Sequence, residues 1–72
     1  MTDKIKQDYG LLAAAFGKRR LPLEVRRSAA GFYLGTREDG APFSRESDQY
    51  WRTRKAAQRA LKSGDWTQRL EL

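Results

Sequence analysis

Residues 31–40 read GFYLGTREDG, and this stretch decides the fold. Its side chains alternate between two faces, one bearing Phe32, Leu34 and Thr36, the other bearing Tyr33, Gly35 and Arg37. A period of two predicts a β-strand with one covered face. The Asp39-Gly40 pair that follows predicts a tight turn, because glycine accepts the positive φ that such turns require.

Segments on both sides of this strand complete a sheet. Residues 23–27 read LEVRR and alternate in the same way, which predicts a strand before residue 31. Residues 41–47 predict the partner strand after the turn, with Pro42 indicating an edge position or the first residue of the strand. By strand alternation Phe43 and Trp51 would point to the same side of the sheet, but the positions between them on that side are the polar Arg45, Ser47 and Gln49. We therefore expect a bulge or loop around residues 46–49.

Apolar residues at helical spacing predict a helix over residues 3–16. Its N-cap is Asp3, and its apolar stripe consists of Ile5, Tyr9, Leu12, Ala13 and Phe16. Gly17 is the expected left-handed terminator, and Pro22 prevents the helix from continuing.

A second helix is predicted to begin after Thr53, which is a good N-cap residue. Its narrow apolar stripe consists of Ala56, Ala57, Ala60 and Leu61, and Gly64 fits the position just after its end. We expect Trp66 to fold back onto the core. The predicted fold is therefore α+β: an N-terminal helix, a three-stranded antiparallel sheet and a second helix packed on one sheet face. A chain of 72 residues buries only about 60% of its unfolded surface, so we expect one domain spanning residues 1–72.

Histidine and cysteine are both absent, which removes the commonest general base, the commonest metal ligand and the most reactive nucleophile. The carboxylates Glu38, Asp39, Glu46 and Asp48 fall in an expected turn and loop, where we interpret them as solvated. No phosphate-binding loop, nucleophile elbow, calcium loop or zinc-protease pattern occurs. We therefore expect no enzyme activity, no metal and no cofactor.

The lack of cysteine also fits a reducing compartment. The first residues, MTDKI, form no apolar signal segment, and no run approaches the roughly 18 apolar residues of a membrane span. We therefore expect a cytoplasmic protein without membrane contact.

The net charge of +6 is unevenly distributed. Residues 18–37 carry six basic side chains against one acidic, residues 38–52 carry two against four, and residues 53–72 carry five against two. A strongly basic small domain is typical of nucleic-acid binding. DNA or RNA is therefore the first expected partner.

Three basic surfaces are candidates for that contact. The first is the sheet face bearing Arg26, Tyr33 and Arg37; the second is the run Lys18, Arg19 and Arg20 with Arg26 and Arg27. A secondary basic face lies on the second helix, at Arg54, Lys55, Arg59 and Lys62. Arginine and lysine neutralise phosphates, and tyrosine stacks on bases. An ordinary solvated surface remains the alternative for each.

Part of the chain resembles a known family. The matching features are the strand of residues 31–37, the Asp39-Gly40 turn, the return at Tyr50-Trp51, and the segment TRKAAQRAL of residues 53–61. Residues 31–61 are thereby similar to the arm-type DNA-binding domains, β-hairpin plus helix, of phage and transposon integrases, and to small uncharacterised phage or plasmid proteins. The resemblance implies that the sheet face contacts the major groove of DNA through Tyr33, Arg37 and Arg45. The helix of residues 3–16 is additional, and the acidic residues of 38–48 would repel phosphate.

That acidic stretch keeps a second hypothesis open. Separate basic and acidic patches with surplus aromatic residues, Tyr50, Trp51 and Trp66, fit a protein-binding module. Such a module would be, for instance, a phage- or plasmid-encoded modulator of a host complex. A homodimer that pairs edge strands is compatible with either hypothesis.

Overall fold

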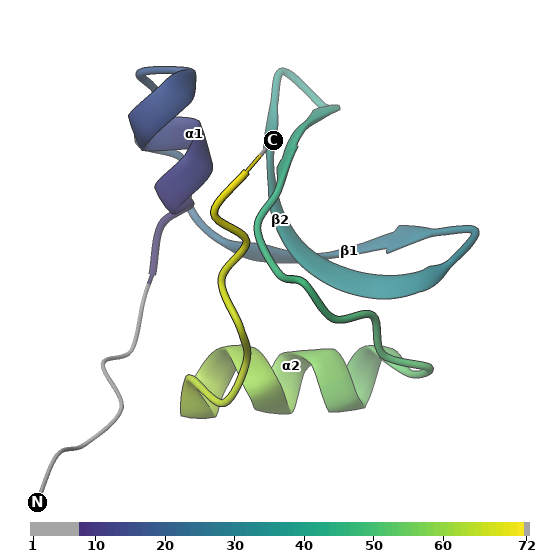
Figure 1. Ribbon diagram of the computed structural model, residues 1–72. Helices are drawn as coiled ribbons and strands as arrows, with labels where there is room; N and C mark the ends of the chain where they lie inside the picture. The colour runs from purple at the N-terminus through teal and green to yellow at the C-terminus, as the bar shows by residue number, and fades with distance from the viewer. Residues whose placement is uncertain (1–7, 72) are drawn as a thin grey trace, which may run out of the picture.

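The computed structural model describes residues 8–71 and contains five regular elements (Figure 1). They are α1 (Leu11–Phe16), β1 (Glu24–Ser28), β2 (Gly31–Glu38), β3 (Ala41–Arg45) and α2 (Arg54–Ser63). The strands form one antiparallel sheet in the order β1-β2-β3. The α+β fold expected from the sequence is confirmed.

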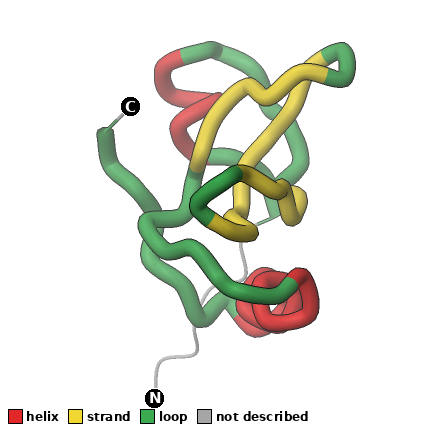
Figure 2. Tube along the Cα trace, turned by 90° about the vertical axis from the view of Figure 1, so that its right-hand side faces the viewer, coloured by secondary structure: helices red, strands yellow, loops and turns green. Residues whose placement is uncertain are grey.

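Both helices pack on the same face of the sheet, at different ends. Leu34 of β2 is fully buried. It packs in the core with Leu23, the residue just before β1, and with Ala57 of α2. Thr36, on the same face two residues further along, is also fully buried, and the methyl group of Thr36 lies next to Gly10 at the start of α1. Figures 1 and 2 show α1 and α2 well apart, with the bent sheet connecting them.

The opposite face of the sheet bears no helix among the described residues. Strand register places Arg26 beside Tyr33 and Glu24 beside Gly35 on this face. Arg45 of β3, the neighbouring strand on the other edge of β2, also pairs with Gly35. We call this surface the open face, and it carries charged and aromatic side chains instead of an apolar layer.

The turn between β2 and β3 is as predicted. Asp39 and Gly40 have φ of 54° and 81°, the left-handed values that a tight hairpin turn requires. The expected irregularity after β3 is also present, because the amides of Glu46 and Ser47 both donate to the carbonyl of Leu34. A further register shift lies between Thr36 and Arg37.

The first helix is much shorter than the one predicted over residues 3–16. Residues 1–7, including Asp3 and Ile5, lie outside the described part of the chain. Tyr9 bridges Pro22 in strand-like pairing, and the Gly10 amide donates to Leu21, so the helix begins only at Leu11. The long prediction is therefore wrong over residues 8–10, where pairing with a later segment overrides helical periodicity.

The end of α1 also differs from expectation. Gly17 has right-handed values, φ −92° and ψ −10°, while Lys18 adopts the left-handed conformation with φ of 56°. Phe16, predicted to face the core, is 57% exposed, because a helix of six residues reaches the sheet only through Leu12 and Ala13.

The second helix agrees with its prediction. The Thr53 hydroxyl accepts the amide of Ala56 at 3.1 Å, and Gly64 ends the helix with φ of 79°. Trp66 folds back onto the core as expected, and Trp51 packs there too. No helix within residues 8–71 is long and apolar enough to span a membrane.

Candidate nucleic-acid interface

Two stretches of sequence without any acidic residue meet at one end of the sheet. Residues 25–37 contain three arginines, and residues 49–64 contain five basic side chains. Phe32 and Trp51 join them, since each donates its amide to the carbonyl of the other, at 2.8 and 2.7 Å. The chain thus places at this end of the sheet basic residues more than twenty positions apart: Arg26 on the open face, Arg27 on the face that bears the helices, and Arg52, Arg54 and Lys55 around the start of α2. We call these five residues the hairpin basic cluster.

Two members of the cluster stack on the same aromatic ring. The guanidinium carbon of Arg27 lies 5.8 Å from the centroid of Phe32, and that of Arg54 lies 5.2 Å from it. Both arginines are exposed, whereas Phe32 is half-buried against the core. Cation–π contact restricts the two guanidinium groups while leaving them in solvent.

The open face is more closely packed than the sequence suggests. Tyr33 points away from the core, as predicted, but it is only 8% exposed, so the expectation of an exposed Tyr33 is wrong. Its ring lies across Gly35, and the ring of Tyr50 meets it edge-on with centroids 5.9 Å apart. Tyr50, at 38% exposure, is the more accessible ring of the pair.

Two arginines flank these tyrosines. The Arg45 guanidinium lies 4.8 Å from the Tyr50 centroid, donates to the Tyr50 hydroxyl, and donates from Nε to the Ser47 carbonyl at 3.1 Å. Arg26, opposite Tyr33, is half-buried, and its Nε is buried without a hydrogen-bond partner among the described residues. The open face therefore positions both arginines, but it uses part of the hydrogen-bonding capacity of Arg45 internally and buries the Nε–H group of Arg26.

Several of the predicted site arginines are paired with carboxylates. Arg37 contacts Glu24 at 3.1 Å, and Arg19 contacts Glu38 at 3.1 Å. In both pairs the arginine is exposed and the glutamate half-buried, so the pairs offset charge more than they stabilise the fold. Arg37 therefore presents less free positive charge than its position in the sequence indicates.

The run Lys18, Arg19 and Arg20 is not brought together with the hairpin basic cluster. It follows α1, and its ion pair with Glu38 places it near the β2–β3 turn, at the other end of β2 from Phe32. Arg20 stacks on Tyr9 with 4.4 Å between guanidinium carbon and ring centroid. The structure thus separates two basic groups that were expected to act together.

The secondary basic face on α2 has the predicted orientation. Ala57 and Ala60 face the sheet and are buried, while all four basic residues of the face are exposed: Arg54, Lys55, Arg59 and Lys62. Arg54 and Lys55 in the first turn belong to the hairpin basic cluster, whereas Arg59 and Lys62 lie one and two turns further along the helix.

Glu46 was interpreted as a solvated loop residue, and this is wrong, because Glu46 is fully buried. Its carboxylate accepts the backbone amides of Leu12 at 2.8 Å and Ala13 at 3.0 Å, in the first turn of α1. It also accepts the Ser44 hydroxyl and, at 2.8 Å, Nε2 of Gln68. This carboxylate is satisfied inside the protein and does not face a partner.

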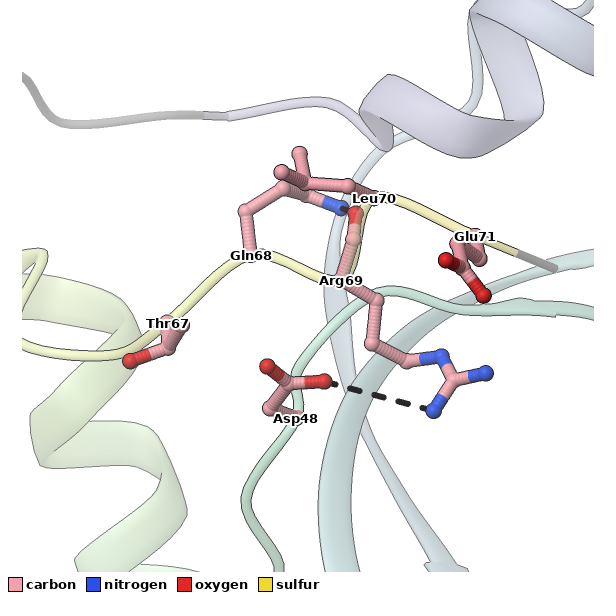
Figure 3. A pocket seen from close by; sticks show the side chains of 6 residues that line it. All are labelled: Asp48, Thr67, Gln68, Arg69, Leu70 and Glu71. Carbon is pink, nitrogen blue, oxygen red and sulfur yellow. Dashed lines mark hydrogen bonds and ion pairs between the residues drawn. The ribbon is translucent and has the colours of Figure 1, made fainter.

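Asp48 lies beside the C-terminal segment. Figure 3 shows the Arg69 side chain directed toward Asp48, with 4.0 Å between Nη1 and the carboxylate. The hollow there is lined by both acidic and basic residues, Asp48, Thr67, Gln68, Arg69, Leu70 and Glu71. Its mixed charge makes it a poor site for a polyanion.

Sequence reasoning missed Arg52 as part of the hairpin basic cluster, the ring of Phe32 as the ring on which two arginines stack, and Tyr50 as the partner of Tyr33 on the open face. A usable signal existed, because residues 25–37 and 49–64 are both free of Asp and Glu. Within residues 8–71, no cluster of His, Cys, Asp and Glu side chains could hold a metal ion. No family model, curated protein or solved structure matches this chain.

Proposed function

We propose that this protein binds nucleic acid, DNA or RNA, without catalysing a reaction, and that the hairpin basic cluster is its contact surface. The observation that carries the proposal is the joining of two acid-free segments through the Phe32–Trp51 hydrogen bonds. Clustered basic side chains neutralise backbone phosphates and release condensed counterions. Such binding needs no active site.

The placement of the acidic residues supports the proposal. Glu46 is buried, and Glu24 and Glu38 are paired with arginines. Asp39 lies in the turn after β2, at the end of that strand opposite to Phe32. Within residues 8–71, no carboxylate forms an ion pair with a member of the hairpin basic cluster.

The direct test is fluorescence anisotropy with labelled duplex and single-stranded DNA and RNA of random sequence, at about 50 and about 200 mM salt. We expect binding at the lower salt that falls steeply at the higher. Replacing Arg26 and Arg52 with Gln should lower the slope of log affinity against log salt by about two. The matched control replaces Lys18 and Arg20 with Gln and should change the slope less. Absence of binding at the lower salt rejects the function, and an equal effect of the control rejects the cluster as its site.

The setting of this function is also part of the proposal. The resemblance of residues 31–61 to integrase arm-binding domains supports an accessory role in a phage or plasmid. The lack of cysteine supports the cytoplasm as its compartment.

A second candidate function, binding to an apolar segment of another protein, is favoured by one observation. Phe16 is 57% exposed and Phe43 39% exposed, and both line a shallow hollow between α1 and β3. Trp51 and Trp66, expected to be surplus aromatics, pack against the core and do not contribute. A tagged protein should then retain a partner after nuclease treatment and lose it on Phe16→Ser. Loss of that partner on nuclease treatment alone would reject this candidate.

A further inference from the structure

Arg27 and Arg54 come from different elements and converge on one ring. Arg27 lies in β1 directly across from Phe32, and Arg54 is the first residue of α2. Their guanidinium carbons lie 5.8 and 5.2 Å from the Phe32 centroid. The same ring therefore anchors one cationic side chain from β1 and one from α2.

The base of this arrangement is fixed. Phe32 is held through both of its backbone groups by Trp51, and it packs against the core residues around Leu34. A partly buried ring therefore holds two exposed guanidinium groups in place. Preorganised donors lose less conformational entropy when they bind a ligand than mobile ones do.

The hydrogen-bonding capacity of both guanidinium groups is unused. Among residues 8–71, neither Arg27 nor Arg54 makes an ion pair or a side-chain hydrogen bond. The acidic residue closest to Arg27 in the sequence, Glu24, pairs with Arg37 on the open face, and the one closest to Arg54, Asp48, lies beside Arg69. A guanidinium group presents N–H donors in a planar fork that matches the oxygens of a phosphate.

We propose that Arg27 and Arg54 form a clip that holds one phosphate group of the nucleic-acid backbone, a proposal that rests on the nucleic-acid-binding function above. Both guanidinium groups lie over the Phe32 ring, so that ring is not open to a stacked base. The clip contacts a phosphate and not a base, so its contribution to binding affinity does not depend on the nucleic-acid sequence.

The first experiment compares two double variants that remove the same charge. Arg27→Gln with Arg54→Gln removes the clip, whereas Arg59→Gln with Lys62→Gln removes two charges from the later turns of α2. With a 20-base-pair duplex, the clip variant should lose about tenfold or more in affinity and about one in salt slope, because the clip holds a single phosphate. The control should lose clearly less. Equal losses overturn the clip while leaving the nucleic-acid function standing.

The second experiment keeps the charge and removes the stacking. Arg27→Lys with Arg54→Lys preserves two positive charges but not the planar fork, and Phe32→Leu preserves an apolar core residue but not the ring. Both variants should bind the duplex more weakly than the unmodified protein while retaining its circular-dichroism spectrum. Unchanged affinity in the folded lysine variant overturns the clip.

A third measurement separates the clip from the function on which it rests. Inorganic pyrophosphate is titrated into ¹⁵N-labelled protein, and the arginine side-chain Nε–H resonances are followed. The signals of Arg27 and Arg54 should shift together, and Arg27→Gln should abolish the shift of Arg54. If this occurs without any DNA or RNA binding, the function fails and the anion site stands. If neither signal shifts, the clip is overturned.

Discussion

Gly10 lies so close to Glu46 that a methyl group on Gly10 would come within 2.6 Å of a carboxylate oxygen and 2.5 Å of the Thr36 methyl. Gly10 has an ordinary extended conformation, with φ of −80°, so it is required for close approach and not for backbone freedom. The absent side chain lets the Glu46 carboxylate reach the first amides of α1, at Leu12 and Ala13.

Gly10→Ala should therefore destabilise the protein. The added methyl group meets a buried carboxylate that cannot move without losing its hydrogen bonds, and overpacking of this kind costs about 1–3 kcal/mol. Urea unfolding followed by tryptophan fluorescence measures the change. The control is Gly40→Asn, where nothing lies within 4 Å of the added Cβ and asparagine tolerates the left-handed φ. A neutral Gly10→Ala would contradict the packing at this site.

Glu46→Gln should lower the free energy of unfolding by about 2–3 kcal/mol, because the amide group replaces one of two carboxylate oxygens, each of which accepts from two donors, with a group that itself donates. The matched control is Asp48→Asn, which alters only an exposed pair with 4.0 Å between its atoms. That variant should stay within about 0.5 kcal/mol of the unmodified protein. Equal unfolding midpoints for the two variants would disprove the distinction between them.

Arg26→Leu is expected to leave stability unchanged or to raise it by up to about 1 kcal/mol. Its Nε is buried without a partner, and an unsatisfied buried donor costs about 1–3 kcal/mol that the leucine side chain does not incur. The same variant should weaken binding to duplex DNA. Thermal unfolding and anisotropy on one preparation test both statements, and a large drop in melting temperature would show that Arg26 supports the fold.

Glu24→Gln should strengthen nucleic-acid binding several-fold at low salt. The carboxylate now pairs with Arg37 at 3.1 Å on the open face, so its removal frees one positive charge on that face. Asp39→Asn, at the β2–β3 turn, removes the same charge far from the cluster and serves as the control. A larger gain from Asp39→Asn would place the contact surface at the other end of the sheet.

Local chemistry made most of the fold predictable. Alternation fixed the faces of β2, the Asp39-Gly40 pair fixed the hairpin, and Thr53 with Gly64 fixed the limits of α2. Each of these signals depends on residues within a few positions of one another. The start of α1 was not predictable, because it depends on pairing between Tyr9 and Pro22 and on a carboxylate from a distant loop.

The candidate site was predictable only in part. Arg26, Arg27 and Arg54 were identified from charge alone, since basic residues without acidic neighbours are visible in the sequence. The burial of Tyr33 was not, because it depends on the ring of Tyr50 arriving from a loop. The convergence of two arginines on Phe32 likewise requires the chain to return at Trp51, which no local pattern encodes.

The contacts of Glu46 also determine the order in which the chain can fold during its synthesis. A helix of six residues is too short to persist by itself in water. Leu12 receives its hydrogen-bond acceptor from a residue 34 positions later, and that acceptor is held by Gln68, which the ribosome adds later still. The segment made early must therefore wait for segments made late, and a truncated chain that ends before Gln68 leaves α1 without its full anchor.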